Sequence, residues 1–221
     1  MDISTYLTNP TSRVFGTVTI ATVFSFLVSL FVESVPLLTT VMLSNATSVL
    51  IFLVATLVLG FVLVLGGRAI SKGNILLTLG AFAFSVAITF SVVFAYFMSM
   101  TAAPIFASVA IFFAMLTLVA EKGEEEYYKS FKNYFVMGIA GMIAAIVLGN
   151  IFSYSIFITV VSVLFVLVFA FAAGFITTLK GKRLDGYEAN AAGAIFGCFG
   201  VVFLFFVLMP GADAILPDID S

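Results

Sequence analysis

Seven long runs of apolar residues decide what this chain can fold into. An α-helix rises about 1.5 Å per residue, so roughly 20 residues cross a hydrocarbon core of about 30 Å. The runs are Val14–Val32, Ser48–Gly67, Ile75–Met98, Pro104–Ala120, Tyr134–Asn150, Tyr154–Leu179 and Asn190–Met209. All five prolines lie at the ends of these runs or outside them, so none removes a backbone donor inside the bilayer. We therefore predict an all-α, polytopic membrane protein with seven transmembrane helices.

The composition points to the same class. Of the 221 residues, 63% are hydrophobic and 9% are charged, whereas a soluble globular domain has about 45–50% and about 25%. One water-soluble core cannot enclose this much apolar surface. A net charge of −2 gives no indication of a nucleic-acid partner. The chain has no His and one Cys, which excludes His-based metal or haem ligation and an internal disulfide.

The basic residues all fall on one side of a seven-helix arrangement. They are Arg13, Arg68, Lys72, Lys122, Lys129, Lys132, Lys180, Lys182 and Arg183. The other side has only acidic residues, namely Glu33, Asp213, Asp218 and Asp220. Basic loops remain in the cytoplasm, so we predict a cytoplasmic N-terminus and an external C-terminus. The predicted division is a cytoplasmic N-terminus (1–13), a transmembrane domain (14–209) and an acidic outer tail (210–221).

Glu33 ends the first apolar run and is the candidate acid for an ion path. A carboxylate at the edge of a span extends toward the headgroups, so we interpret Glu33 as a boundary residue. The alternative is an acidic outer rim, shared with Asp213, that collects cations. Arg68 is a further candidate for the ion path or its gate. The longest cytoplasmic loop is either a solvated loop or a partner site, and its candidate contact residues are Glu124, Glu125, Glu126, Tyr127 and Tyr128.

Few side chains in the predicted helices could carry out catalysis. No Lys lies inside a run, and the runs hold neither a pair of Asp residues nor a His or Cys cluster. We expect neither an enzyme nor a bound cofactor. The small residues of Gly193-xxx-Gly197, and Gly138, Gly141 and Gly149, are expected to let neighbouring helices pack closely.

Three stretches carry a resemblance to a known family. They are Ile75–Phe97, Ile105–Leu118, and Phe165–Lys180 followed by Asn190-Ala191-Ala192. Together with the seven-run layout, they resemble the Bax inhibitor-1 (transmembrane BAX inhibitor motif) family in its bacterial form. The resemblance implies six helices around a central seventh, in a bacterial inner membrane. It also implies either a pH-sensitive calcium leak or a role in membrane-protein quality control.

The leak in that family depends on two aspartates, which share a proton between the sixth and seventh helices. An ungapped placement puts these positions at Phe175 and Val202, and neither Ile156–Leu179 nor Asn190–Met209 contains Asp or Glu. We therefore hold two hypotheses. The first is a cation leak, of calcium or protons, without the acid pair. The second is a non-transporting scaffold or regulator that binds another membrane protein.

The hydroxyl side chains of the apolar runs can distinguish these hypotheses. They include Thr17, Thr22, Ser25, Ser29, Ser85, Thr89, Ser91, Thr117, Thr159 and Ser162. A leak requires these groups to converge on one hydrated cavity. A scaffold allows them to scatter and to bond to the backbone of their own helices.

Overall fold

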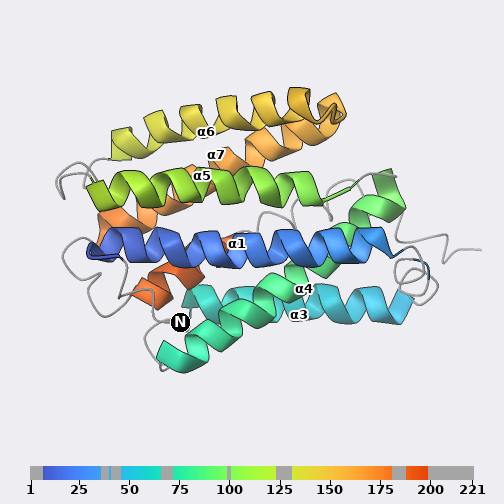
Figure 1. The fold of residues 1–221 in the computed structure, drawn as a ribbon. Helices are drawn as coiled ribbons and strands as arrows, with labels where there is room; N and C mark the ends of the chain where they lie inside the picture. Colours follow the sequence, from blue (N-terminus) through green and yellow to red (C-terminus); the bar gives the residue numbers. More distant parts are fainter. Residues whose placement is uncertain are drawn as a thin grey trace, which may run out of the picture.

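The computed structural model is a bundle of long helices (Figure 1) and describes residues 7–35, 40, 46–65, 72–98, 101–122, 131–180 and 188–198. The helices are α1 (Pro10–Ser34), α3 (Ala46–Leu65), α4 (Lys72–Met98), α5 (Ala103–Lys122), α6 (Phe131–Ile151) and α7 (Ile156–Lys180). A seventh helical segment covers 188–198. Within these residues there is no strand. The predicted all-α fold is confirmed. The second half of the seventh predicted helix, 199–209, lies outside the described residues.

Within the described part of the chain, five helices are long and apolar enough to cross a membrane. These spans are Pro10–Ser34, Asn74–Ala95, Ala103–Lys122, Asn133–Ile151 and Ile156–Thr177. Their outward surfaces are apolar: Phe31, Leu77 and Leu118 are all more than 60% exposed. Such surfaces are stable against lipid chains and unfavourable against water. The chain is therefore an integral membrane protein of the multi-pass type.

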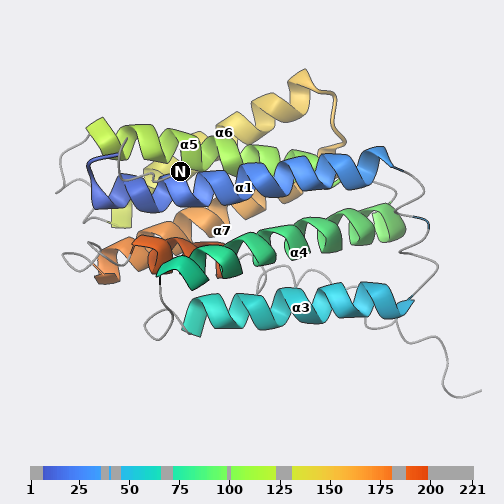
Figure 2. The ribbon, with the colours of Figure 1, turned by 60° about the horizontal axis from the view of Figure 1, so that its bottom comes forward.

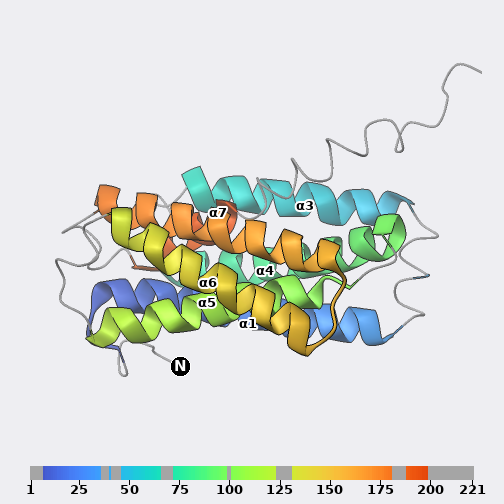
Figure 3. The ribbon, with the colours of Figure 1, turned by 90° about the horizontal axis from the view of Figure 1, so that it is seen from above.

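The helices lie side by side, and helices that follow one another in the chain run in opposite directions (Figures 1 and 2). Helix α1 packs against both α5 and α4, and α3 packs against α4. Helices α6 and α7 form a hairpin that packs on α5 (Figure 3). Short connections between long apolar runs favour such antiparallel pairs, because each successive helix must return across the bilayer.

Phenylalanine rings fill the centre of the bundle. The Phe113 ring of α5 lies 6.1 Å from the Phe15 ring of α1 and 5.4 Å from the Phe169 ring of α7. On α4, the Phe90 ring lies 5.5 Å from the Phe165 ring. These rings are at most 1% exposed, and their tilted and edge-on contacts are the favourable geometry for aromatic pairs. The core therefore joins α1, α4, α5 and α7 into one unit.

Segment 188–198 lies inside this bundle. Its Ala191, Ala192 and Ile195 side chains are completely buried. The Phe196 ring meets Phe82 of α4 edge-on at 5.5 Å and also contacts Phe169 of α7. On the α3 side, a Cβ added to Gly193 would lie 3.0 Å from the Leu63 side chain. This is the arrangement expected of a central seventh helix, in which small residues allow close approach.

The small residues of α6 also face its neighbours. A Cβ added to Gly138 would lie 2.8 Å from the Cβ of Ala170 on α7. One added to Gly141 would lie 2.5 Å from the Phe112 ring of α5, and one added to Gly149 would overlap Thr159. Each glycine thus allows a helix contact that alanine would obstruct. The expectation that these residues serve helix packing is confirmed.

Candidate functional site

The carboxylate of Glu33 lies at the meeting point of three helices. Its Oε1 accepts hydrogen bonds from Ser29 Oγ on α1 at 3.0 Å and from Ser91 Oγ on α4 at 3.2 Å. The backbone N–H groups of Ala102 and Ala103, at the start of α5, donate to the same oxygen at 2.6 Å and 3.3 Å. The last turn of α1 therefore supplies the acceptor for the first turn of α5.

This arrangement has a simple physical cause. The first N–H groups of a helix have no partner within it, and the helix dipole makes that end positive. Ala102 and Ala103 have no side-chain acceptor of their own, so a carboxylate from another helix takes the place of an N-cap. Glu33 is half-buried and faces into the bundle. This differs from the predicted boundary residue that reaches out to the headgroups.

Hydroxyl pairs continue from Glu33 along both sides of α4. Between α1 and α4, Ser29 Oγ lies 2.6 Å from Ser91 Oγ, and Ser25 Oγ donates to the Ala83 carbonyl at 3.0 Å. Between α3 and α4, Thr56 Oγ1 lies 2.7 Å from Ser85 Oγ and 3.2 Å from Thr89 Oγ1. Each of these six hydroxyl residues is at most 4% exposed. They bond across the helix interfaces, to another hydroxyl or, for Ser25, to a backbone carbonyl, so they join helices.

Most of the other predicted hydroxyls bond to their own helix. The Thr17, Thr117 and Thr159 side chains each donate to the carbonyl four residues earlier. Thr22 does the same, and Thr89 does so in addition to its contact with Thr56. Such back-bonding satisfies a hydroxyl in an apolar environment without a partner helix or water. The alternatives were convergence on one hydrated cavity and scattered bonding. The hydroxyls of the described residues show scattered bonding to their own helices, with some direct pairs between helices.

A second carboxylate cluster lies where the end of α5 meets the start of α1, at the opposite end of these two helices from Glu33. Glu121, in the last turn of α5, accepts from Thr8 N at 2.9 Å and from Thr8 Oγ1 at 2.6 Å. It also accepts from Asn9 N at 3.4 Å and from the Ser12 hydroxyl. Asn9 caps α1 through its bond from Thr11 N, and its Nδ2 donates to the Ala120 carbonyl. Helices α1 and α5 therefore cap each other's N-terminus.

Sequence reasoning did not identify this second cluster. The signal that was present is local: Thr8-Asn9-Pro10 is a typical helix start, with an N-cap residue followed by proline. Nothing in the sequence links it to Glu121, 113 positions away from Thr8. Only the antiparallel packing of α1 on α5 brings the two together.

An ion pair joins α1 to the central segment at the Glu121 end. Arg13 Nη1 lies 3.2 Å from Glu188 Oε1, and Glu188 is 7% exposed. Arg13 is also held by α1's own start, because its Nε and Nη2 donate to the Leu7 and Thr8 carbonyls. The second carboxylate oxygen of Glu188 is buried without a hydrogen-bond partner in the described part of the chain. Loss of Arg13 would therefore leave the buried Glu188 carboxylate unpaired among the described residues, whereas loss of Glu188 would leave Arg13 its two backbone acceptors.

The other predicted site residues are not brought into these clusters. Arg68, Asp213 and the loop Glu124–Tyr128 lie outside the described residues. Phe175, at the position of the first family aspartate, is 60% exposed on α7, and Val202 lies outside the described residues. At this register, an acid in place of Phe175 would face lipid. Among the described residues, no group of three His, Cys, Asp or Glu side chains is positioned to hold a metal ion.

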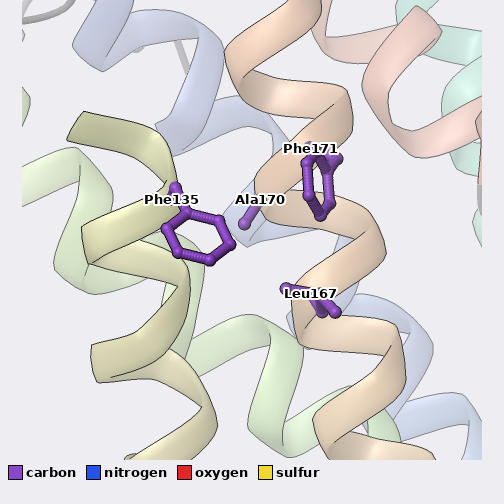
Figure 4. A pocket seen from close by; sticks show the side chains of 4 residues that line it. All are labelled: Phe135, Leu167, Ala170 and Phe171. Atoms are coloured by element: carbon purple, nitrogen blue, oxygen red, sulfur yellow. The ribbon is translucent and has the colours of Figure 1, made fainter. Parts of the chain in front are cut away.

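A shallow apolar hollow lies between α6 and α7 on the outside of the bundle (Figure 4). Phe135, Leu167, Ala170 and Phe171 line it, and the Phe135 and Phe171 rings lie 6.3 Å apart. None of these side chains offers a donor, an acceptor or a titratable group. The hollow can therefore contact an apolar surface, and its lining supplies no group for a reaction.

In comparisons with known proteins, no family model, curated protein or solved structure matches this chain. The resemblance to the Bax inhibitor-1 family therefore depends on the quoted stretches and on the seven-helix layout. Function has to be argued from the two carboxylate clusters, the hydroxyl pairs and the ion pair.

Proposed function

We propose that this protein is a Bax inhibitor-1-like integral membrane protein that acts as a scaffold or regulator by binding another membrane protein. In this proposal the folded bundle does not conduct ions and the protein is not an enzyme. Its membrane is a bacterial inner membrane, with the N-terminus in the cytoplasm and the C-terminus outside. The basic side chains Arg13 and Lys122 lie at the bundle end opposite Glu33, which supports that orientation.

The bonding of the buried oxygens carries the proposal. A cation crossing a bilayer must exchange its water shell for oxygen atoms that are free to face it. Here the Ser29 and Ser91 oxygens are 2.6 Å apart, and Glu33 Oε1 receives four donors. Donors that point at a carboxylate oxygen repel an approaching cation. The oxygens best placed for a cation path are therefore already engaged in holding α1, α4 and α5 together.

Calcium flux into liposomes that hold the purified protein tests the proposal. We expect no flux above that of empty liposomes at about pH 6 or about pH 8, the two sides of a titration shared by close carboxylates. Reconstituted protein should be shown to be folded by its helical circular dichroism and by a single size-exclusion peak. Flux at either pH would contradict the non-conducting scaffold.

A cation leak is the second candidate, and the line of oxygens along α1 favours it. Ser25, Ser29 and Glu33 are spaced four residues apart and so share one face of α1, turned toward α4. If α1 and α4 separated, this face would become a polar path that begins at a carboxylate. Flux that falls in the Ser29→Ala and Ser91→Ala variants, with no change in the neighbouring exposed-residue variant Ser34→Ala, would support the leak.

A further inference from the structure

The turn between α6 and α7 exposes large apolar side chains where a loop in water would be polar. Ile151 is 67% exposed, Phe152 is 59% exposed and Ile156 is 84% exposed. No Lys, Arg, Asp or Glu occurs anywhere in Tyr134–Leu179, which contains the whole turn. A contiguous apolar patch of this kind is unfavourable in water and indicates a surface that contacts something else.

The backbone of the turn is hydrogen-bonded internally. Tyr154 N donates to the Gly149 carbonyl at 2.9 Å, and Ser153 N donates to the Asn150 carbonyl at 3.3 Å. Ser153 has a φ of 53°, in the left-handed region. These three features define a Schellman motif, which satisfies the last carbonyls of α6. Thus α6 ends without depending on water.

The polar side chains around the turn are also satisfied locally. Ser155 Oγ accepts from Ile158 N at 3.3 Å and so caps the start of α7. Asn150 Nδ2 donates to the Ile146 carbonyl at 2.9 Å. In a lipid environment, every unsatisfied backbone group costs free energy, so irregular backbone survives there only if its groups are paired. The hydrogen bonds of this turn meet that requirement.

The aromatic side chains of the turn fit the boundary between headgroups and acyl chains. The Phe152 and Tyr154 rings stack with centroids 5.7 Å apart. Burial, and then the negative charge of Glu33, raise the pKa of the Tyr154 phenol. The phenol therefore stays neutral at physiological pH. A neutral phenol beside an apolar ring is typical of the aromatic belt at a membrane interface.

We propose that the α6–α7 turn, residues 151–156, is immersed in the lipid interface of the leaflet on the Glu33 side, where it contacts phospholipids. The exposed apolar surface of the turn continues the lipid-facing sides of α6 and α7, on which Val147 and Val160 are 48% and 50% exposed. Phospholipid therefore covers Ile151, Phe152 and Ile156. This inference depends on membrane embedding alone and goes beyond the scaffold proposal.

The absence of tryptophan from the chain allows a direct test. The Phe152→Trp variant places a single fluorophore on the turn, and Phe24→Trp places one on the exposed side of α1 near its middle, where Phe24 is 41% exposed. Both variants are reconstituted into liposomes made with phosphatidylcholine brominated either near the headgroup or near the end of the acyl chain. Aqueous iodide serves as the quencher from water.

For Phe152→Trp, we expect bromine near the headgroup to quench about twofold more strongly than bromine near the chain end, as an interfacial aromatic would show. For Phe24→Trp the order should be reversed. Stronger quenching of Phe152→Trp by iodide than by either lipid would overturn the proposal, and so would stronger quenching by the deep bromine. If Phe152→Trp does not fold, Ile151→Trp tests the same turn with the same expected order.

Discussion

Replacing Glu33 by alanine tests whether one carboxylate holds the C-terminal ends of α1 and α4 to the start of α5. Glu33→Ala removes the acceptor of four hydrogen bonds. Ser29 and Ser91 keep each other as partners at 2.6 Å. The Ala102 and Ala103 N–H groups lose the acceptor that Glu33 supplies. The loss of folding free energy in Glu33→Ala should therefore come mainly from the two N–H groups at the start of α5.

The magnitude follows from that loss. Removing an N-cap acceptor costs about 0.5–2 kcal/mol, and a hydrogen bond to a charged group contributes about 1.5–3 kcal/mol. Because Glu33 is half-buried, we take the lower part of these ranges for two backbone bonds. We expect Glu33→Ala to lower the free energy of unfolding by about 2–3 kcal/mol. Glu33→Gln retains an acceptor oxygen and loses only its charge at a helix N-terminus, so it should cost about 1 kcal/mol or less.

Reversible unfolding in mixed micelles, followed by circular dichroism, measures these differences. Ser34→Ala is the matched control, because Ser34 is the exposed neighbour and bonds only to the Leu30 carbonyl of its own helix. Hydrogen exchange should localise the effect: amides at the start of α5 should exchange faster in Glu33→Ala, whereas amides in the middle of α7 should not. A Glu33→Ala protein as stable as Ser34→Ala would refute the capping argument, and so would equal losses in the alanine and glutamine variants.

Three further substitutions test other contacts. Ser153→Gly should raise the free energy of unfolding by about 0.5–1 kcal/mol. The left-handed backbone strains a residue that has a Cβ, and this strain exceeds the conformational entropy that glycine loses on folding. A lower melting temperature would contradict this. Arg13→Ala should cost about 3 kcal/mol by leaving Glu188 buried and unpaired, and adding Glu188→Gln should restore part of the loss in a double-mutant cycle. Gly141→Ala should cost about 1–3 kcal/mol through overlap with Phe112 and Val166. Its control is Gly80→Ala, whose added Cβ meets nothing within 4 Å and which should be neutral or stabilising.

The membrane helices could be predicted from the sequence because one property, the length of the apolar runs, determines them. The predicted Val14–Val32 and the observed Pro10–Ser34 differ mainly at the start, where Asn9 and Pro10 begin the helix before the apolar run does. The division between α6 and α7 was predicted between the runs Tyr134–Asn150 and Tyr154–Leu179. The structure places a Schellman motif there, with Ser153 in the position that glycine usually occupies.

The roles of the carboxylates could not be predicted, because they are tertiary. Glu33 caps the start of α5 by accepting from the N–H of Ala102, 69 positions later. Its sequence neighbours indicate only the end of an apolar run, which is equally compatible with a side chain that reaches the headgroups. The same limit applied to the hydroxyls: their positions were visible, but whether they bond to their own helix or across an interface depends on helix rotation.

Two carboxylates in the described part of the chain share one property, which bears on whether ions can cross. Glu33 lies at the start of α5, and Glu121 lies at the start of α1. A helix N-terminus is the positive end of its dipole, so each site favours a fixed anion and disfavours a cation beside it. A cation could bind Glu33 Oε1 or the Glu121 carboxylate only in competition with the N–H donors at the start of a helix. Conduction through these residues should therefore accompany loss of stability: any Glu33 or Ser29 variant that conducts calcium should also unfold more easily than the parent protein. A conducting variant of unchanged stability would show that ions take a route away from these carboxylates.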